Sequence, residues 1–500
     1  MLFNSIHFML FFPVVLLVLF VIPKKLRCFW LLAASYYFYM SWNPKYALLI
    51  AFSTLTTYLS GIILDKVSAE DTPNRDKKRK LTVAFSFIIN IGILFFFKYF
   101  DFLLDNINAV LNTAGISLIE NPFDIILPVG ISFYTFQALS YTMDIYRGEV
   151  KVEKNIIRYA LFVSFFPQLV AGPIERSSNL IAQIEEIPTK KLWNYERVIK
   201  GLIMVLWGLF MKMVIADRVA SLANKVFNNY WTMDSFALII GALGFALQIY
   251  CDFASYSTIA IGAAQIMDIK LMENFDTPYF AQSIKEFWRR WHISLSTWFR
   301  DYLYIPLGGN RCSRTRKCIN LMITFLVSGL WHGAAWNYVV WGGLHGAYQI
   351  IGELTLPFRK RLKKYLDIDD NSISGRLGKT LVTFGLTTFA WIFFRSKSLS
   401  AAFVYIQRIF TRIDLWSPFS DAIYELGLDN MEMNVLFVAV VILLLVDLIK
   451  YLKNKRLDDF LFEQNLWFRW AVLIALFMGI VIFGAYGSSF DPQAFIYFQF

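Results

Sequence analysis

Long apolar runs separated by short polar segments recur along the whole chain. Most of them approach the roughly 17 to 25 residues that cross a hydrocarbon core as a helix. The clearest are Phe8 to Ile22, Phe29 to Trp42, Tyr46 to Leu64, Leu81 to Leu104, Ile125 to Met143, Val198 to Ile215, Phe236 to Cys251, Leu381 to Phe394, Val435 to Ile449 and Trp470 to Tyr486. The pattern predicts an all-α fold: a polytopic bundle with about ten to twelve transmembrane spans.

Composition agrees with a membrane protein. The 500 residues are 57% hydrophobic and only 17% charged, whereas about a quarter of the residues of a soluble domain are charged. The formal net charge of +11 comes from basic loops beside a membrane, so we expect membrane lipids and no nucleic acid as partners. The chain shows no internal repeat and no long linker, so residues 1–500 are interpreted as one membrane domain.

The basic loops also predict the orientation. Clusters of Lys and Arg follow several apolar runs, whereas two other loops, Asp105 to Phe123 and Ile413 to Asn434, contain neither residue type. The positive-inside rule places the basic clusters in the cytoplasm and both termini outside. The first run lacks a basic segment before it and a small-residue cleavage site after it, so we expect a retained helix.

Two segments depart from simple spanning. Ser164 to Ser178, SFFPQLVAGPIERSS, interrupts an apolar stretch with two prolines, a glycine and an acidic-basic pair, which indicates a re-entrant or interfacial segment that is either buried in protein or lines a cavity. Leu321 to Ile351 lies between two cytoplasmic basic clusters and predicts two short spans, with the small residues of LWHGAAWN near the reversal.

Two of the four histidines, His332 and His345, lie in that second segment. An imidazole at membrane depth is costly unless it is paired or faces a watery cavity, so such residues are functional candidates. The alternative is a histidine that bridges helices by hydrogen bonding. We favour function for His332, which small residues surround, and the structural interpretation for His345 and for His7.

The segment Ser283 to Arg300, SIKEFWRRWHISLSTWFR, predicts an amphipathic helix on the cytoplasmic side. Its polar face carries Lys285, Arg289 and His292. That face is either a solvated interfacial surface or the wall of a funnel in which Lys285 and Arg289 bind a phosphate-bearing donor and His292 meets His332.

Asp252 ends an apolar run next to several hydroxyl residues. This carboxylate either orients a histidine or binds a substrate, or it is an interfacial cap. The four cysteines form no C-x-x-C pair and the histidines lack metal-ligand spacing beside them, so we predict neither a disulfide nor a metal site.

Four motifs, in chain order, resemble those of the membrane-bound O-acyltransferases. They are LVAGPIER, YCDFASYSTIAIGAA, FWRRWHISLSTWFRDYLYIPLGGNR and SGLWHGAAWNYVVWGGLHG. The likeness covers nearly the whole chain and is greatest to membrane subunits of bacterial alginate O-acetyltransferases, alongside peptidoglycan O-acetyltransferases and D-alanine exporters of teichoic acid. It implies a helical bundle around a central funnel, with the LWHG histidine, His332, as the catalytic residue and the WRRWH histidine, His292, linked to activity.

The resemblance also implies the chemistry. Members of the family transfer an acyl group from a cytoplasmic thioester, acetyl-coenzyme A or an acylated carrier protein, towards a hydroxyl on the far side of the membrane. Such a transfer requires a base near neutrality and donors for the oxyanion. His332 suits the base, and His292 either stabilises the oxyanion or relays protons. The donor is a substrate, and no bound cofactor is expected.

The chain ends FDPQAFIYFQF, and residues 495–500 resemble the F-I-Y-x-x-F ending of cell-envelope acyl-transfer systems. In such systems the tyrosine, here Tyr497, is thought to carry the acyl group briefly as an ester. The alternative is an aromatic anchor at the lipid headgroups. The resemblance thus implies a protein of the bacterial cytoplasmic membrane that passes an acyl group, acetyl above all, to a separate extracytoplasmic SGNH-type transferase or other polysaccharide-modifying partner.

Other functions stay open at this point. Within the family, alginate, another exopolysaccharide, peptidoglycan and teichoic acid are all possible acceptors, and the acyl group could be D-alanyl. A transporter of an envelope precursor would also need intramembrane polar residues, although the chain has no inverted repeat. A scaffold for a polymer synthase would leave the histidines without a role.

Overall fold

The computed structural model describes residues 1–123, 125–365, 367, 369–370 and 372–486, and these residues form helices and connecting segments without a strand. The chain divides into two compact units, and the division falls within α9 (Tyr195–Phe210) and α11 (Ser235–Ile266). Unit 1 comprises Met1–Leu202 and Ile259–Met272; unit 2 comprises Ile203–Thr258 and the chain from Glu273 onwards. The all-α expectation is confirmed. The interpretation as one domain, and the central funnel, stay predictions.

Unit 1 is built from helices that bury polar side chains against one another. Its elements are α1 (Ile6–Val21), η1 (Lys24–Leu26), α2 (Arg27–Met40), α3 (Tyr46–Ser68), α4 (Arg75–Thr113), α5 (Ile131–Arg147), α6 (Ile156–Ser164), α7 (Phe166–Leu169) and α8 (Ser177–Glu186). Hydroxyls connect the helices: Tyr159 Oη donates to Thr57 Oγ1 over 2.7 Å, and Ser177 Oγ donates to the carboxylate of Asp144 over 2.6 Å. Lipid provides no hydrophobic driving force for helices to associate, so hydrogen bonds of this kind help to stabilise the bundle.

Most of the irregular stretch, Ser164 to Glu175, is buried inside unit 1, which is one of the two settings expected for such backbone. Its re-entrant or interfacial course stays a prediction. It contains the single turn α7 and the tight bend at Gly172, where a Cβ would lie 2.3 Å from the Cα of Gln168. Glu175 is 1% exposed, and its carboxylate accepts from the Met272 N–H and, over 2.7 Å, from Asn179 Nδ2. Burial raises the pKa of Glu175 to about 7.

Unit 2 contains the five described candidate residues, which are Asp252, Lys285, Arg289, His292 and His332. Its elements are η2 (Met211–Ala216), α10 (Asp217–Asn228), η3 (Pro278–Phe280), α12 (Ile284–Arg290), α13 (Ile293–Phe299), η4 (Arg300–Tyr304), α14 (Arg314–His332), α15 (Trp336–Leu354), α16 (Leu356–Tyr365), α17 (Ile373–Arg395), α18 (Leu399–Thr411), η5 (Ser417–Phe419), η6 (Asp421–Glu425), α19 (Asn430–Lys453), α20 (Leu457–Phe462) and α21 (Leu466–Phe483). Tryptophan and phenylalanine side chains from α12, α14, α15 and α17 form its core.

Seven of the described helical segments are long and apolar enough to cross a membrane. They are Tyr46–Ser68, Arg75–Thr113, Tyr195–Asn228, Ser235–Ile266, Ile373–Arg395, Asn430–Lys453 and Leu466–Phe483. The expected ten to twelve included runs that form shorter helices, such as α1 with 16 residues and α2 with 14. The multi-pass bundle is confirmed, and the shorter helices account for the difference in number.

α14 and α15 form the predicted hairpin, with its reversal at Gly333 to Ala335. Two glycines allow the helices to approach closely. A Cβ on Gly342 would lie 2.2 Å from the carbonyl oxygen of Phe325, and one on Gly329 would lie 2.3 Å from that of Tyr338. Small residues at a helix crossing serve this purpose in membrane bundles.

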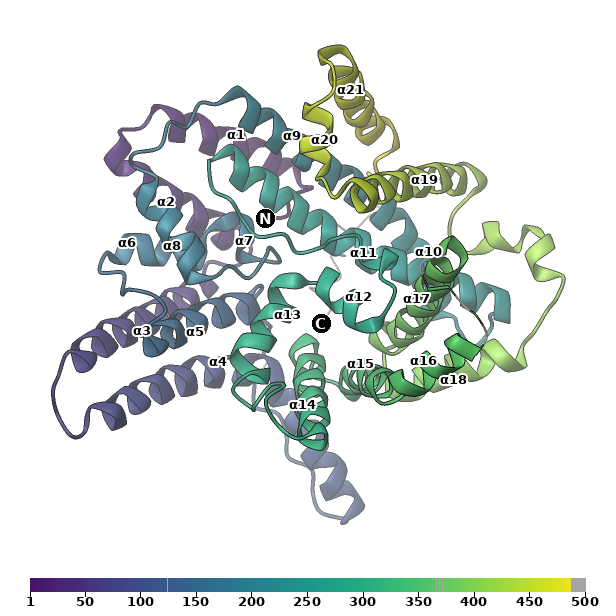
Figure 1. Cartoon of the computed structure of the whole chain (residues 1–500), viewed down its shortest axis with the longest axis horizontal. Coiled ribbons are helices and arrows are strands. Elements are labelled where there is room, and N and C mark those ends of the chain that lie inside the picture. The colour runs from purple at the N-terminus through teal and green to yellow at the C-terminus, as the bar shows by residue number, and fades with distance from the viewer. Residues whose placement is uncertain (124, 366, 368, 371, 487–500) are drawn as a thin grey trace. The chain divides into compact units, whose positions relative to one another are not determined.

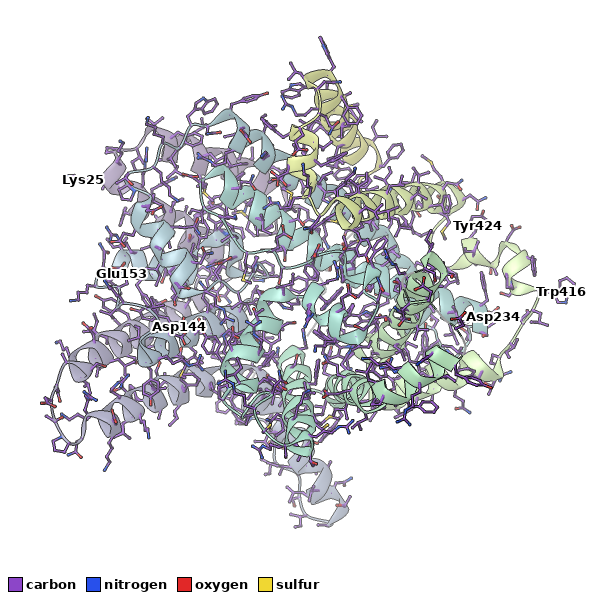
Figure 2. All side chains as sticks on the ribbon, in the orientation of Figure 1. Lys25, Asp144, Glu153, Asp234, Trp416 and Tyr424 are labelled. Carbon is purple, nitrogen blue, oxygen red and sulfur yellow. The ribbon has the colours of Figure 1, made fainter. Side chains whose placement is uncertain are left out.

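The segment between α18 and α19 exposes aromatic side chains. Trp416 is 80% exposed and Phe419 86%, and Figure 2 shows Trp416 pointing away from the ribbon. This segment belongs to the loop without Lys or Arg that the sequence analysis placed outside.

Candidate functional site

His332 is the last residue of α14, and an aromatic shell surrounds it. Its ring centroid lies 5.0 Å from those of Trp331 and Trp341 and 5.5 Å from that of Phe394 on α17. The side chain is buried, with the residue 5% exposed. The hairpin therefore delivers an imidazole to the core of unit 2 at the point where the chain reverses.

His292 lies in the same core but not where the helical pattern placed it. The sequence predicted one amphipathic helix from Ser283 to Arg300, with His292 on its polar face. Instead the helix breaks at Trp291 and His292: α12 ends at Arg290, α13 begins at Ile293, and His292 has φ 43° and ψ 55°. This left-handed conformation is uncommon outside glycine and turns the side chain inwards, so that His292 is fully buried.

The loop before η3 stabilises this unusual backbone. The Ile293 N–H donates to the Asn274 carbonyl over 2.9 Å, and the Asp276 N–H donates to the Arg290 carbonyl over 2.9 Å. These two bonds flank His292 and compensate the cost of about 1 to 3 kcal/mol that such a conformation carries.

The two histidines lie close together, as the sequence hypothesis required. Their ring centroids are 6.4 Å apart, with the planes inclined by 59°. The Phe253 and His292 rings pack nearly at right angles with their centroids 4.6 Å apart, and His292 Nδ1 lies 3.0 Å from Asn274 Oδ1. Burial lowers the pKa of His292 to about 3, so this imidazole is neutral at physiological pH.

His345, on α15, has a structural partner. Trp288 Nε1 donates to His345 Nδ1 over 3.2 Å, so the neutral ring carries its proton on Nε2. The Trp341 ring packs at 5.1 Å from His345 and 5.0 Å from His332. Trp341 Nε1 and His345 Nε2 are buried donors for which the described residues supply no acceptor.

Asp252 pairs with a lysine inside unit 2. Lys212 Nζ lies 2.5 Å from Asp252 Oδ1 and 2.9 Å from Asp217 Oδ1, and all three side chains are at most 8% exposed. Lys212 belongs to the π-helical segment η2, in which residues five apart stack, so Lys212 and Asp217 meet on one face. The substrate-binding role expected of Asp252 stays a prediction.

Lys285 and Arg289 lie on the exposed face of α12, opposite the buried Ile284, Phe287 and Trp288. This part of the amphipathic prediction is confirmed, while the binding of a donor stays a prediction. Tyr497, the candidate acyl carrier, lies outside the described residues.

Sequence reasoning missed two groups of the site. Lys212 could have been found, because a lysine inside the apolar run Val198 to Ile215 signals a buried partner. Asn274 could not, because an asparagine in a loop between helices carries no periodic or compositional signal.

The chain is similar to known acyltransferases. A family model described as the membrane-bound O-acyltransferase family matches residues 149–364, which include His292 and His332. A protein named probable alginate O-acetylase AlgI from Pseudomonas aeruginosa is 37% identical over 414 residues, covering 82% of this chain and 74% of its own. A peptidoglycan O-acetyltransferase from Helicobacter pylori is 36% identical over 401 residues, covering 75% and 72%. A teichoic acid D-alanyltransferase from Bacillus subtilis is 29% identical over 291 residues, covering 55% and 70%.

Proposed function

The chain belongs to the membrane-bound O-acyltransferase family and is therefore an O-acyltransferase. We propose that it moves an acetyl group from a cytoplasmic thioester across the membrane for the O-acetylation of an envelope polysaccharide, with His332 as the base. The observation that carries this proposal is the pair of buried imidazoles, His292 and His332, 6.4 Å apart inside one aromatic core. A base near neutrality on the acceptor hydroxyl is what acyl transfer needs, and imidazole suits it.

In the proposed reaction His332 removes the proton of the attacking hydroxyl as its oxygen bonds to the thioester carbonyl carbon. The carbon–sulfur bond then breaks, and the thiolate leaves with the proton. Between the attack and the loss of the thiolate, negative charge develops on the carbonyl oxygen, and fixed N–H donors stabilise this charge. The buried donors Trp341 Nε1 and His345 Nε2, in the ring cluster around His332, supply such groups in this proposal.

The first acceptor in the proposal is the phenol of Tyr497. Transfer to it leaves a tyrosyl ester and a free thiol, and a separate extracytoplasmic transferase of the SGNH type then moves the acyl group to a glycan hydroxyl and regenerates Tyr497. This order needs the C-terminus outside, as the basic loops predict. It also needs the donor in the cytoplasm and a bacterial cytoplasmic membrane, as the family resemblance implies. The donor is acetyl-coenzyme A or an acylated carrier protein.

The test is the intact mass of the purified protein after incubation with acetyl-coenzyme A and with an acetylated carrier protein, each supplied separately. Wild type is expected to gain one acetyl group from one donor, and His332→Ala and Tyr497→Phe to gain none. An adduct that persists in Tyr497→Phe would remove that residue from the relay. An adduct formed at the wild-type rate in folded His332→Ala would refute His332 as the base.

A second acyl group has support from one comparison. The similarity to a teichoic acid D-alanyltransferase favours D-alanyl transfer as the alternative. Incubation with a D-alanylated carrier protein separates the two, because the adduct masses differ.

A further inference from the structure

The amide of Asn274 connects three groups around His292, all within unit 2. Its Oδ1 lies 3.0 Å from His292 Nδ1, 2.9 Å from Ser294 Oγ and 3.2 Å from the backbone nitrogen of Ser294. Its Nδ2 donates to Ser257 Oγ on α11 over 3.0 Å. Asn274 is 1% exposed and His292 is fully buried, so water does not compete for these bonds.

The orientation of this amide is determined by the backbone. The oxygen and nitrogen of an asparagine side chain look alike, and the hydrogen-bond network must distinguish them. A backbone N–H can only donate, so the atom that faces the Ser294 nitrogen has to be the acceptor, Oδ1. The flipped amide would place two donors against each other and leave both unsatisfied, at a cost of about 1 to 3 kcal/mol.

The tautomer of His292 follows from that orientation. Oδ1 accepts and never donates, so His292 Nδ1 must carry the proton in the bond to Asn274. In the neutral ring the other nitrogen, Nε2, then carries the lone pair. A neutral His292 can accept a proton or a hydrogen bond at Nε2 but cannot donate one there.

We propose that Asn274 is a positioning residue that holds His292 in the Nδ1-protonated tautomer, which makes Nε2 the proton-accepting atom that His292 offers to acyl transfer. This inference rests on the proposed function. Of the two roles that the sequence left open, it selects the proton relay and excludes donation from neutral Nε2 to the oxyanion. The histidine that faces His292 is His332, on α14.

The nearby carboxylates of the surrounding elements already have cationic partners. Asp252 on α11 is paired with Lys212, and Asp276 on the loop is paired with Arg290 over 3.1 Å. A carboxylate placed at position 274 would therefore be a new charge on His292, which makes Asn274→Asp an informative variant.

Asn274→Asp keeps the shape and the three bonds that Oδ1 accepts, while Ser257 Oγ rotates to donate to the second oxygen. A carboxylate beside an imidazole favours the protonated ring, and such neighbours shift a pKa by about 1 to 3 units. We expect the acid limb of the pH–rate profile for acyl transfer to move to higher pH by that amount. In Asn274→Ala we expect kcat to fall about 10- to 100-fold, by analogy with the partners that orient metal-binding histidines, with KM for the donor unchanged.

Ser257→Ala is the matched control, because it removes a partner of Asn274 without changing the atom that faces His292. Its profile should keep the wild-type acid limb. If Asn274→Asp, folded and active, has the same profile as Ser257→Ala, the proposal is wrong.

The tautomer itself can be measured without turnover. The chain has four histidines, so ¹⁵N spectra of histidine-labelled protein are simple, and the signals missing in His292→Gln identify His292. We expect a protonated Nδ1 and an unprotonated Nε2 in wild type. A protonated Nε2 would overturn the proposal. If wild type transfers no acyl group yet shows the expected tautomer, the proposed function fails and the tautomer assignment stands.

Discussion

Replacement of Lys212 should destabilise unit 2 more than replacement of any single exposed charge. Its ammonium contacts Asp252 over 2.5 Å and Asp217 over 2.9 Å, and the three side chains are 8%, 2% and 3% exposed. Lys212→Met removes the cation and leaves both carboxylates buried beside each other. Breaking one buried ion pair in this way costs about 3 to 5 kcal/mol.

The second carboxylate adds to that cost. Two oxygens that share one ammonium lie within about 5 Å of each other, and at an effective dielectric constant of about 20 their repulsion is about 3 kcal/mol. Protonation of one carboxyl relieves part of it, so we expect Lys212→Met to lower the free energy of unfolding by about 5 kcal/mol, at the upper end of the range for one pair.

The assay is equilibrium unfolding in detergent, followed by the fluorescence of the chain's 15 tryptophans. Lys200→Met is the control, because its lysine side chain, 19% exposed, pairs over 2.8 Å with a Glu196 carboxylate that is 55% exposed and so stays hydrated when the lysine is lost. A pair of this kind contributes about 1 kcal/mol or less.

A neutral version of the whole cluster completes the test. Lys212→Met combined with Asp217→Asn and Asp252→Asn leaves no charge to desolvate, and we expect it to be more stable than Lys212→Met alone. The reasoning is refuted if Lys212→Met unfolds like Lys200→Met, or if the triple variant is less stable than the single one.

Three further predictions concern the core of unit 2. Gly342→Ala should separate α14 from α15, because its Cβ would meet the Phe325 carbonyl at 2.2 Å; we expect a lower unfolding midpoint, whereas Gly385→Ala, with open space around its Cβ, should keep the wild-type value. Trp288→Phe leaves His345 Nδ1 buried without its donor, which should cost about 1 to 3 kcal/mol in the same unfolding assay. Stability should fall with acidification. The pKa of His292 is about 3 in the fold against an ordinary 6.5, so between these values the unfolded chain binds a proton that the folded chain does not. The stability that the neutral His292 contributes above pH 6.5 is therefore lost as the pH falls towards 3. His292→Gln should show a smaller loss of midpoint between pH 7.5 and 5.5 than wild type, and an equal loss would contradict this.

Hydrophobic periodicity was enough to predict the membrane bundle, because runs of apolar residues must be helical in lipid. The hairpin that carries His332 also needed the basic clusters on both sides of Leu321 to Ile351, which the positive-inside rule places on the same side of the membrane. The same periodicity predicted a continuous helix through His292, and there it was wrong. Nothing in FWRRWHISL breaks a 3.6-residue period, and the break depends on backbone bonds to the loop around Asn274, more than a dozen residues away.

The candidate site, too, could be predicted only in part. His332 and His292 could be singled out, because polar side chains in an apolar setting are conspicuous in a sequence. Their environment could not, because the partners Asn274, Trp341 and Phe394 come from separate elements and only packing brings them together.

The hairpin of α14 and α15 also bears on how the protein is made. Neither helix is among the seven segments that are long and apolar enough to cross a membrane, so each is a weak signal for insertion on its own. Their short reversal and the glycine contacts at Gly329 and Gly342 allow the two helices to pack against each other as soon as both have been translated. His332 would then be in place on the hairpin before α17, which supplies Phe394, has been translated, and the aromatic shell would close only when that later helix is added.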